Sequence, residues 1–273
     1  MMRSLWTASS GMSSQMLSVD TIANNIANVN TTGFKREKLE FQSLLYETMQ
    51  GAGNLPEVVG NRPANLQVGH GVRAVASTRN FTMGHIELTA SLTDFAIQGS
   101  GFMMVERGIN GEIGFTRDGS FNLSPVGGGM LRLVTNDGFP VLDADGDWIE
   151  IEEAHAVNLA VSREGVFTSR DADGDVIELG INLGVFQFPN RQGLEAIGGN
   201  LFVQTAASGA AILEAPGDVG SMSQIIHQAI ERSNVQIADE MVSLINSQRA
   251  FELNSRIIQT SDDMLQQATN MRR

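Results

Sequence analysis

The stretch DTIANNIANVNTTGFK, residues 20–35, starts as an amphipathic helix and then runs into asparagine, threonine and glycine. Asparagine is a poor helix former because its side chain competes for backbone hydrogen bonds. Asn24, Asn25 and Asn28 nevertheless lie on this short helix, so we expect it to depend on neighbouring helices to which the amides can bond. Asn30 and Gly33 are predicted to end the helix, because glycine readily takes the positive φ of a C-terminal cap.

This helix is part of a longer seven-residue pattern, which is typical of helices that pack along their length. One position of the pattern is occupied by Leu5, Met12, Val19 and Ile26. The other is occupied by Ala8, Gln15, Ile22 and Val29.

The C-terminal end repeats the pattern. The first position holds Ile237, Leu244, Phe251, Ile258 and Leu265, and the second holds Met241, Gln248, Ser255 and Asp262. Apolar neighbours widen the first position into a stripe that suits contact with more than one helix. Ser233 and Gln236 match a capping box, which predicts that the helix starts there.

Between about residues 71 and 220 the apolar period changes to two. Short strands are predicted at 72–78, 85–90, 94–99, 101–106, 120–124, 131–135, 148–152, 156–162, 165–169, 175–180 and 183–188. Glycine and aspartate separate them at intervals that favour an antiparallel sandwich or barrel without crossover helices. Residues 47–71 fit neither pattern and are interpreted as an extended arm.

These patterns predict an α+β fold. Heptad helices at both termini would pack as a coiled-coil-like inner domain, joined by an extended arm to a central antiparallel all-β domain. The expected divisions are the N-terminal helix at 1–34, the arm at 35–72, the β-rich outer domain at 73–224 and the C-terminal helix at 225–273.

Charge and composition exclude several classes of protein. The net charge of −13 argues against nucleic acid or an anionic membrane as the main partner. Residues 143–178 carry eleven of the acidic residues and only two arginines, which predicts a solvated outer face. Without cysteine there is no disulfide, thiolate site or cysteine nucleophile. The N-terminus lacks the apolar core of a secretory signal, and no apolar run is long enough to span a membrane.

No motif predicts a catalytic, cofactor or metal site. GHGVRA at 69–74 resembles a dinucleotide-binding turn, but an alternating, strand-like stretch follows where a helix is required. DADGD occurs at 143–147 and 171–175, where Asp-Gly favours a hairpin tip over a calcium loop. Glu231 and Glu240 are interpreted as solvated charges on helix faces rather than an acid/base pair.

Both ends of the chain resemble flagellar axial proteins, which build the rod and hook. The N-terminal signature is IANNIAN at 22–28 followed by TGFK at 32–35. The C-terminal one includes QRAFE at 248–252 and Asn254-Ser255, and AIQGSGFMMV at 96–105 agrees with the family's β domain. The length and residues 44–74 resemble the distal rod more than the hook. The resemblance covers most of the chain, except for the acidic, glycine-rich stretch 125–180.

The resemblance implies a structural subunit, not an enzyme, in the basal body of a bacterial flagellum. It implies self-assembly into a helical tube that spans the periplasm and transmits torque from the motor to the hook. The implied partners are further copies of the chain, proximal rod subunits, the hook protein, the L-ring and P-ring bushing, and the flagellar type III export apparatus, which needs no cleaved signal. Neither nucleic acid nor membrane insertion is implied.

The tube would be built from both terminal helices of every copy. The residues expected at the assembly interface are Leu5, Met12, Val19, Ile22, Asn24, Asn25, Ile26, Asn28, Val29, Ile237, Met241, Leu244, Gln248, Phe251, Asn254, Ile258 and Leu265. Asn24, Asn25 and Asn28 are expected to act as anchors between subunits or between helices.

Three other interpretations remain open. The chain could be another axial subunit, from the proximal rod or the hook. It could instead be a trimeric adhesin or phage-type fibre, whose helices would form a closed bundle. A carbohydrate-active enzyme would need paired carboxylates beside aromatic platforms, and Trp148 is the only tryptophan in the β region.

Overall fold

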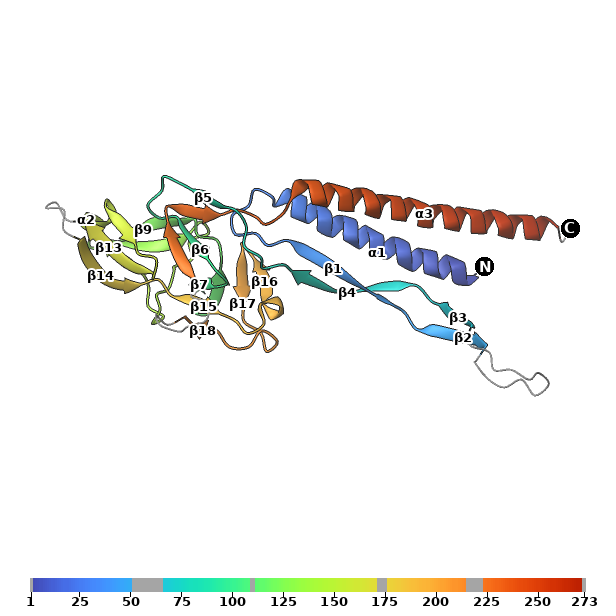
Figure 1. The fold of residues 1–273 in the computed structure, drawn as a ribbon, viewed down its shortest axis with the longest axis horizontal. Coiled ribbons are helices and arrows are strands. Elements are labelled where there is room, and N and C mark those ends of the chain that lie inside the picture. The colour runs from blue at the N-terminus through green and yellow to red at the C-terminus, as the bar shows by residue number, and fades with distance from the viewer. Residues whose placement is uncertain (1, 51–65, 109–110, 171–175, 215–222, 272–273) are drawn as a thin grey trace. The chain divides into compact units, whose positions relative to one another are not determined.

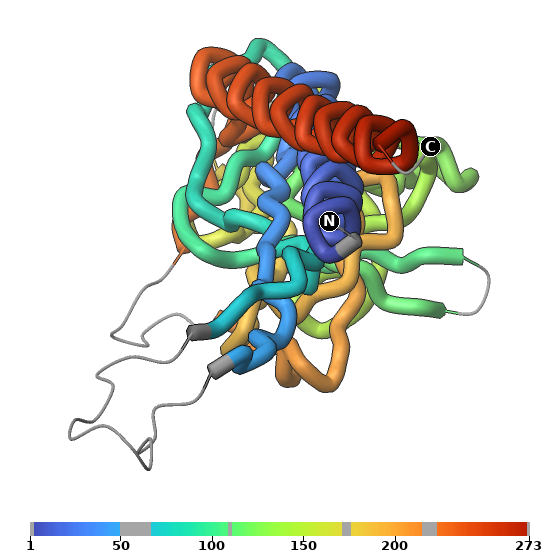
Figure 2. The backbone as a smooth tube through the Cα atoms, turned by 90° about the vertical axis from the view of Figure 1, so that its right-hand side faces the viewer, coloured from blue at the N-terminus to red at the C-terminus, as the bar shows by residue number. Residues whose placement is uncertain are grey.

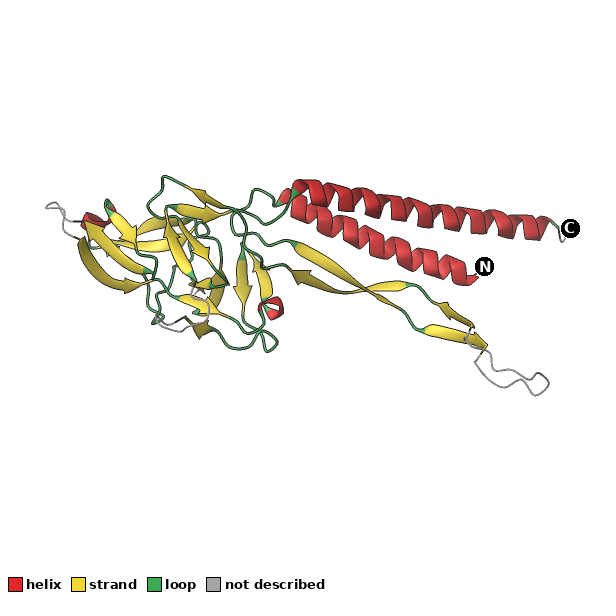
Figure 3. Cartoon of the chain, in the orientation of Figure 1, coloured by secondary structure: helices red, strands yellow, loops and turns green. Residues whose placement is uncertain are grey.

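The chain forms two compact units, each assembled from separate parts of the sequence. The computed structural model describes residues 2–50, 66–108, 111–170, 176–214 and 223–271. We call the first the helical unit; its segments are Met1–Ala27, Glu37–Thr78 and Gln236–Arg273. We call the second the β unit; its segments are Asn28–Arg36 and Arg79–Val235. Both long helices belong to the helical unit, and most of the strands belong to the β unit (Figure 3).

In the helical unit, α1 (Met2–Ala27) and α3 (Ile237–Asn270) lie side by side (Figures 1 and 2). The segment expected to be an extended arm contains paired strands. Strand β1 (Glu37–Ser43) pairs with β4 (Val72–Arg79), and β2 (Tyr46–Gln50) pairs antiparallel with β3 (Leu66–Gly69). The middle of the expected arm, residues 51–65, lies outside the described residues.

Both helix limits differ from the sequence prediction. Helix α1 ends at Ala27, before the last residues of the predicted heptads. Gly33 does have positive φ, at 67°, but it lies six residues beyond the helix and is not its cap. Helix α3 begins at Ile237 with no side-chain cap, so the predicted capping box at Ser233 is wrong. The Ser233 hydroxyl instead accepts a hydrogen bond from the Val235 N–H at 3.3 Å.

The β unit is built from short, mostly antiparallel strands. Its largest sheet has the order β16-β17-β8-β7-β15-β18, and three-stranded sheets have the orders β11-β10-β9 and β12-β13-β14. Two further pairs, β6 with β19 and β5 with β20, bring the chain just before α3 against strands near residue 90. The bounds are β5 Ile86–Leu88, β6 Phe95–Gln98, β7 Phe102–Arg107, β8 Glu112–Thr116, β9 Phe121–Gly127, β10 Met130–Thr135, β11 Glu150–Glu152, β12 Leu159–Val161, β13 Val166–Arg170, β14 Val176–Asn182, β15 Val185–Gln187, β16 Glu195–Gly198, β17 Leu201–Val203, β18 Ile212–Leu213, β19 Gln224–His227 and β20 Ala229–Glu231, with short helices α2 Glu153–Ala156 and η1 Arg191–Gly193.

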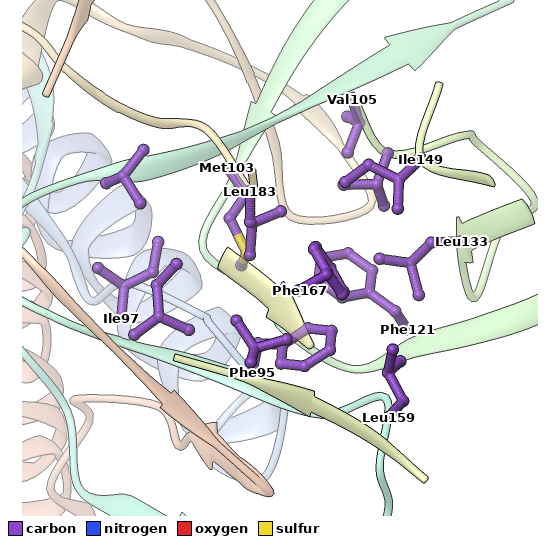
Figure 4. Close-up of a cluster of buried hydrophobic side chains, with 14 of the residues drawn as sticks. Phe95, Ile97, Met103, Val105, Phe121, Leu133, Ile149, Leu159, Phe167 and Leu183 are labelled. Carbon is purple, nitrogen blue, oxygen red and sulfur yellow. The ribbon is translucent and has the colours of Figure 1, made fainter. Parts of the chain in front are cut away.

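Strand β7 lies between the two hydrophobic clusters of the β unit. Because side chains alternate along a strand, Met103 and Val105 enter one cluster while Phe102 and Met104 enter the other. This two-sided burial explains why GFMMVE is apolar without a break. In the first cluster, the Phe95 ring packs edge-on against Phe167 with centroids 5.8 Å apart (Figure 4).

The predicted fold class is confirmed, since the terminal helices pack together and the central sheets are antiparallel. The first DADGD is a hairpin tip, in which the Asp143 carboxylate accepts backbone hydrogen bonds from Asp145, Gly146 and Asp147 at 2.9–3.0 Å. The second DADGD lies outside the described residues. The GHGVRA stretch turns from β3 into β4 and leads into no helix. In the part of the chain that the structure describes, no helix is long and apolar enough to cross a membrane.

Candidate assembly interface

The contact between α1 and α3 includes three pairs of small or polar residues, in an antiparallel seven-residue register. Gly11 faces Asn254, closely enough that a Cβ on the glycine would lie 2.9 Å from the Asn254 amide nitrogen. Seven residues further along α1, the hydroxyl oxygens of Ser18 and Ser247 lie 3.2 Å apart. After another seven, Asn25 meets Glu240. We call these three pairs the seam.

Asn25 connects three elements of the helical unit. Its Nδ2 donates to the Glu240 Oε2 of α3 at 3.3 Å and to the Glu37 carbonyl of β1 at 2.8 Å. Its Oδ1 accepts a bond from the Glu37 N–H at 2.9 Å. Both Asn25 and Glu240 are only 1% exposed. A buried amide can satisfy backbone donors and acceptors together, which no apolar residue at this position could do.

The residues predicted for the interface fall into three groups by exposure. Ile22 and Asn25 are buried within the chain's own fold. The half-buried group is Leu5, Met12, Val19, Ile26, Asn28, Val29, Leu244, Asn254 and Ile258, of which Asn28 and Val29 belong to the β unit. The exposed group is Asn24, Ile237, Met241, Gln248, Phe251 and Leu265. The structure is of one chain, so their assignment to an interface between copies remains a prediction.

Large apolar side chains are exposed on both helices of the pair. Trp6 is 75% exposed and Leu253 is 60% exposed. The other members of this set are Met16, Leu17, Ile237, Met241, Val242, Ile245, Phe251, Ile257, Met264 and Leu265. An amphipathic helix pair normally turns such residues inward; here the three seam pairs are small or polar, and these large apolar side chains remain exposed. Exposed apolar surface of this kind indicates a protein–protein contact.

A groove of about 410 Å³ lies on one flank of the helix pair. Met16 and Val19 of α1 and Phe251 of α3 supply its apolar lining. Gln248 and Glu252 of α3 add polar groups. We use "the groove" for these five residues.

A second polar site, within the β unit, was not found from the sequence. Glu231, at the end of β20, accepts hydrogen bonds on Oε1 from Lys35 Nζ at 2.6 Å and from the Gly84 N–H at 2.7 Å. Its Oε2 accepts one from Arg117 Nε at 3.0 Å. All three charged side chains are at most 1% exposed. We call Lys35, Arg117 and Glu231 the buried charge cluster.

The cluster shifts the titration of its own members. Burial and the neighbouring Arg117 lower the pKa of Lys35 to about 8. Burial opposes ionisation of Glu231, but Arg117 and Lys35 outweigh it and hold the pKa of this carboxyl below its usual range. Because the Glu231 carboxylate pairs with both Lys35 and Arg117, it has a structural role: it joins the segment after α1 to the segment before α3.

Two interpretations made from the sequence are therefore wrong. Glu231 lies in a strand, not on a helix, and neither Glu231 nor Glu240 is solvated. The partners of Glu231 lie 196 and 114 residues away in the sequence, so no local pattern could have revealed them. The seam did leave a signal, since small or polar residues recur seven apart at 11, 18 and 25 and at 240, 247 and 254.

Three family models match separate parts of the chain. The model described as flagella basal body rod protein matches residues 5–35, and the flagellar hook protein FlgE/F/G D1 domain matches 96–169. The model described as flagellar basal body rod FlgEFG protein C-terminal matches 226–271.

Curated relatives match over the full length. The chain is 44% identical to the flagellar basal-body rod protein FlgG of Borreliella burgdorferi, with 100% of both chains covered. It is 42% identical to the protein of the same name from Caulobacter vibrioides, covering 99% of this chain and 100% of the relative. With the one from Bacillus subtilis the identity is 34%, again over 100% of both chains.

Proposed function

Since the chain belongs to the flagellar basal-body rod protein family and is a non-enzymatic structural subunit of the distal rod, we propose that its helix pair is the part that assembles with other copies. In this proposal the copies form a helical tube, and the predicted interface residues lie at the contacts between helix pairs. The single observation that carries it is the set of large apolar side chains left exposed on a helix pair whose seam is made of small and polar residues.

The energetic argument rests on the exposed apolar area. Each large apolar side chain that moves from water into a contact contributes roughly 1.5–3 kcal/mol. Twelve such residues are exposed among the side chains of the two helices that the structure describes. A single copy gains nothing from them, whereas copies packed side by side bury them, so association is favoured over the isolated chain. The polar seam meanwhile keeps α1 and α3 in one register before assembly.

The finer partners follow from the family. As a part of the rod, the protein assembles with other flagellar axial components. We propose that these components are the proximal rod subunits at one end and the hook protein at the other. We also propose that the rod turns inside the L-ring and P-ring bushing in the periplasm, and that the flagellar type III export apparatus delivers the chain. The acidic residues of 143–178 that the structure describes are exposed or half-buried. They would keep this surface hydrated and non-adhesive towards a surrounding ring.

The test is assembly of the purified full-length protein, followed by sedimentation and electron microscopy. The double variant Met241→Ser/Phe251→Ser removes two exposed apolar side chains of α3 and should remain monomeric where the unchanged protein forms long particles. Ile113→Ser removes a comparably exposed side chain from the β unit and is the matched control. If both variants assemble like the unchanged protein, the helix pair is not the assembling surface.

A further inference from the structure

Helix α3 carries apolar residues on two opposite flanks of the seam. Successive residues of an α-helix are rotated by about 100°. Relative to the seam residue Ser247, this places Gln248 and Phe251 roughly 40–100° to one side, where they line the groove. It places Leu253, Ile257 and Met264 roughly 80–120° to the other side. We call these last three residues the edge.

The edge is apolar, and about half of each of its side chains is exposed. Leu253 is 60% exposed, Met264 is 48% exposed and Ile257 is 44% exposed. The spacing of four and seven residues puts them in one row along α3. Such a row fits a groove that runs alongside a helix pair, as knobs of one helix fit between the side chains of another.

The groove has matching size and chemistry. Its volume of about 410 Å³ exceeds the roughly 150 Å³ that suffices to hold a benzene ring in an engineered protein cavity. There is therefore room for more than one aliphatic side chain against Met16, Val19 and Phe251. A row of branched and unbranched apolar residues supplies such side chains.

Charge is complementary as well. Glu252 lies at the groove, while Arg256 follows Leu253 by three residues and directly precedes Ile257 of the edge. Both are exposed, and among the described residues neither forms an ion pair. When an edge enters a groove, an arginine and a carboxylate are brought to the same boundary. Pairing at such a boundary sets specificity and register between partners.

We infer that the groove of one copy receives the edge of a second copy of the same chain. This inference rests on the proposed function and specifies which surfaces meet. Because groove and edge are different surfaces on opposite flanks, the contact is heterologous: each bound copy presents a new groove or a new edge. Addition can then continue without closing into a two-fold dimer, which is the geometry that an extended rod needs.

The absence of native cysteine allows a clean crosslinking experiment. Gln248→Cys labels the groove and Ile257→Cys labels the edge. On one chain these positions are nine residues apart on different sides of α3, roughly 13 Å along the axis, which is too far for a disulfide within the chain. The full-length double variant, oxidised under assembly conditions, should give a ladder of crosslinked species on a denaturing gel. Each single variant alone should give no disulfide dimer, and an equal mixture of the two should give one.

Other results overturn the inference. A double variant that stops at dimers, or a single variant that crosslinks to itself, would mean that like surfaces meet. Polymers that sediment normally but contain no crosslink would leave the proposed function standing and refute this contact. If no polymer forms even for the unchanged protein, the proposed function fails together with the inference.

Charge exchange gives an independent readout. Glu252→Arg and Arg256→Glu should each lower the sedimented fraction. An equal mixture of the two single variants should restore it, because the groove of each variant then meets an edge of opposite charge from the other variant, while the like charges four residues apart within each helix stay as they are. No restoration in the mixture would count against the pairing.

Discussion

Replacing Glu231 by glutamine tests the buried charge cluster most directly. The substitution keeps the shape of the side chain but removes the negative charge that pairs with both Lys35 and Arg117. Two cations that are fully shielded from water would then lack a counter-ion. Breaking a buried pair in this way costs about 3–5 kcal/mol. With the total stability of a domain at roughly 5–15 kcal/mol, the β unit of the variant would lose a large fraction of its unfolding free energy.

The assay is urea unfolding followed by tryptophan fluorescence. In a Trp6→Phe background the only tryptophan is Trp148, which lies in the β unit. The matched control is Glu87→Gln, which removes a carboxylate that pairs with Arg232 at 2.5 Å in an exposed position. Water and salt screen that pair, so its loss should matter far less. If the two variants lose equal amounts of unfolding free energy, the reasoning about burial is refuted.

Four further predictions concern single residues. Lys35 and Lys38 are the only lysines in the sequence. An amine-reactive reagent should modify the exposed Lys38 in the folded protein but modify Lys35 only after unfolding. Peptide mass spectrometry measures both modifications. Because the pKa of Lys35 is lowered to about 8, the unfolded chain holds more protons on this lysine between about pH 8 and pH 10. Its contribution to stability should therefore rise with pH over that range, and a Lys35→Met variant with the same pH slope as Lys38→Met would contradict this. Gly33→Ala should lower the melting temperature clearly more than Gly180→Ala. Both glycines have positive φ, but of the two only Gly33 lies so close to other backbone that an added Cβ would be 2.7 Å from the Asp118 nitrogen. Equal losses of melting temperature would show that the positive φ alone matters. Asn25→Ala should weaken hydrogen-exchange protection of the Glu37 amide by about 1–3 kcal/mol, whereas Asn24→Ala, at an exposed position, should leave that amide protected.

The sequence predicted the elements of the fold well where periodicity is local. Each of the eleven predicted strand segments overlaps a strand of the structure, including β7, whose apolar run has no alternation. The short strands β16 to β20 were not predicted, because two to four residues give too little pattern to recognise. The predicted helix limits were also wrong, because the start of α3 at Ile237 has no capping side chain that could mark it in the sequence.

The candidate site could be predicted only in part, for a physical reason. Apolar heptads mark helices that pack, but they do not say whether the partner belongs to the same chain. In this protein the intramolecular seam uses Gly11, Ser18 and Asn25, while several of the heptad residues, such as Met241 and Phe251, are left exposed. The buried charge cluster was hidden because its members come from three distant parts of the sequence.

Neither unit corresponds to one continuous piece of the gene. The chain passes between the units four times, after residues 27, 36, 78 and 235. A recombinant fragment 79–235 would contain every strand of the β-unit sheets and still keep Glu231 and Arg117 without Lys35. Conversely, splitting the chain after residue 78 would give two pieces, each with parts of both units, and so two halves that must recognise each other to fold. Circular permutation or split-protein complementation is thus the natural way to isolate either unit, and simple truncation is not.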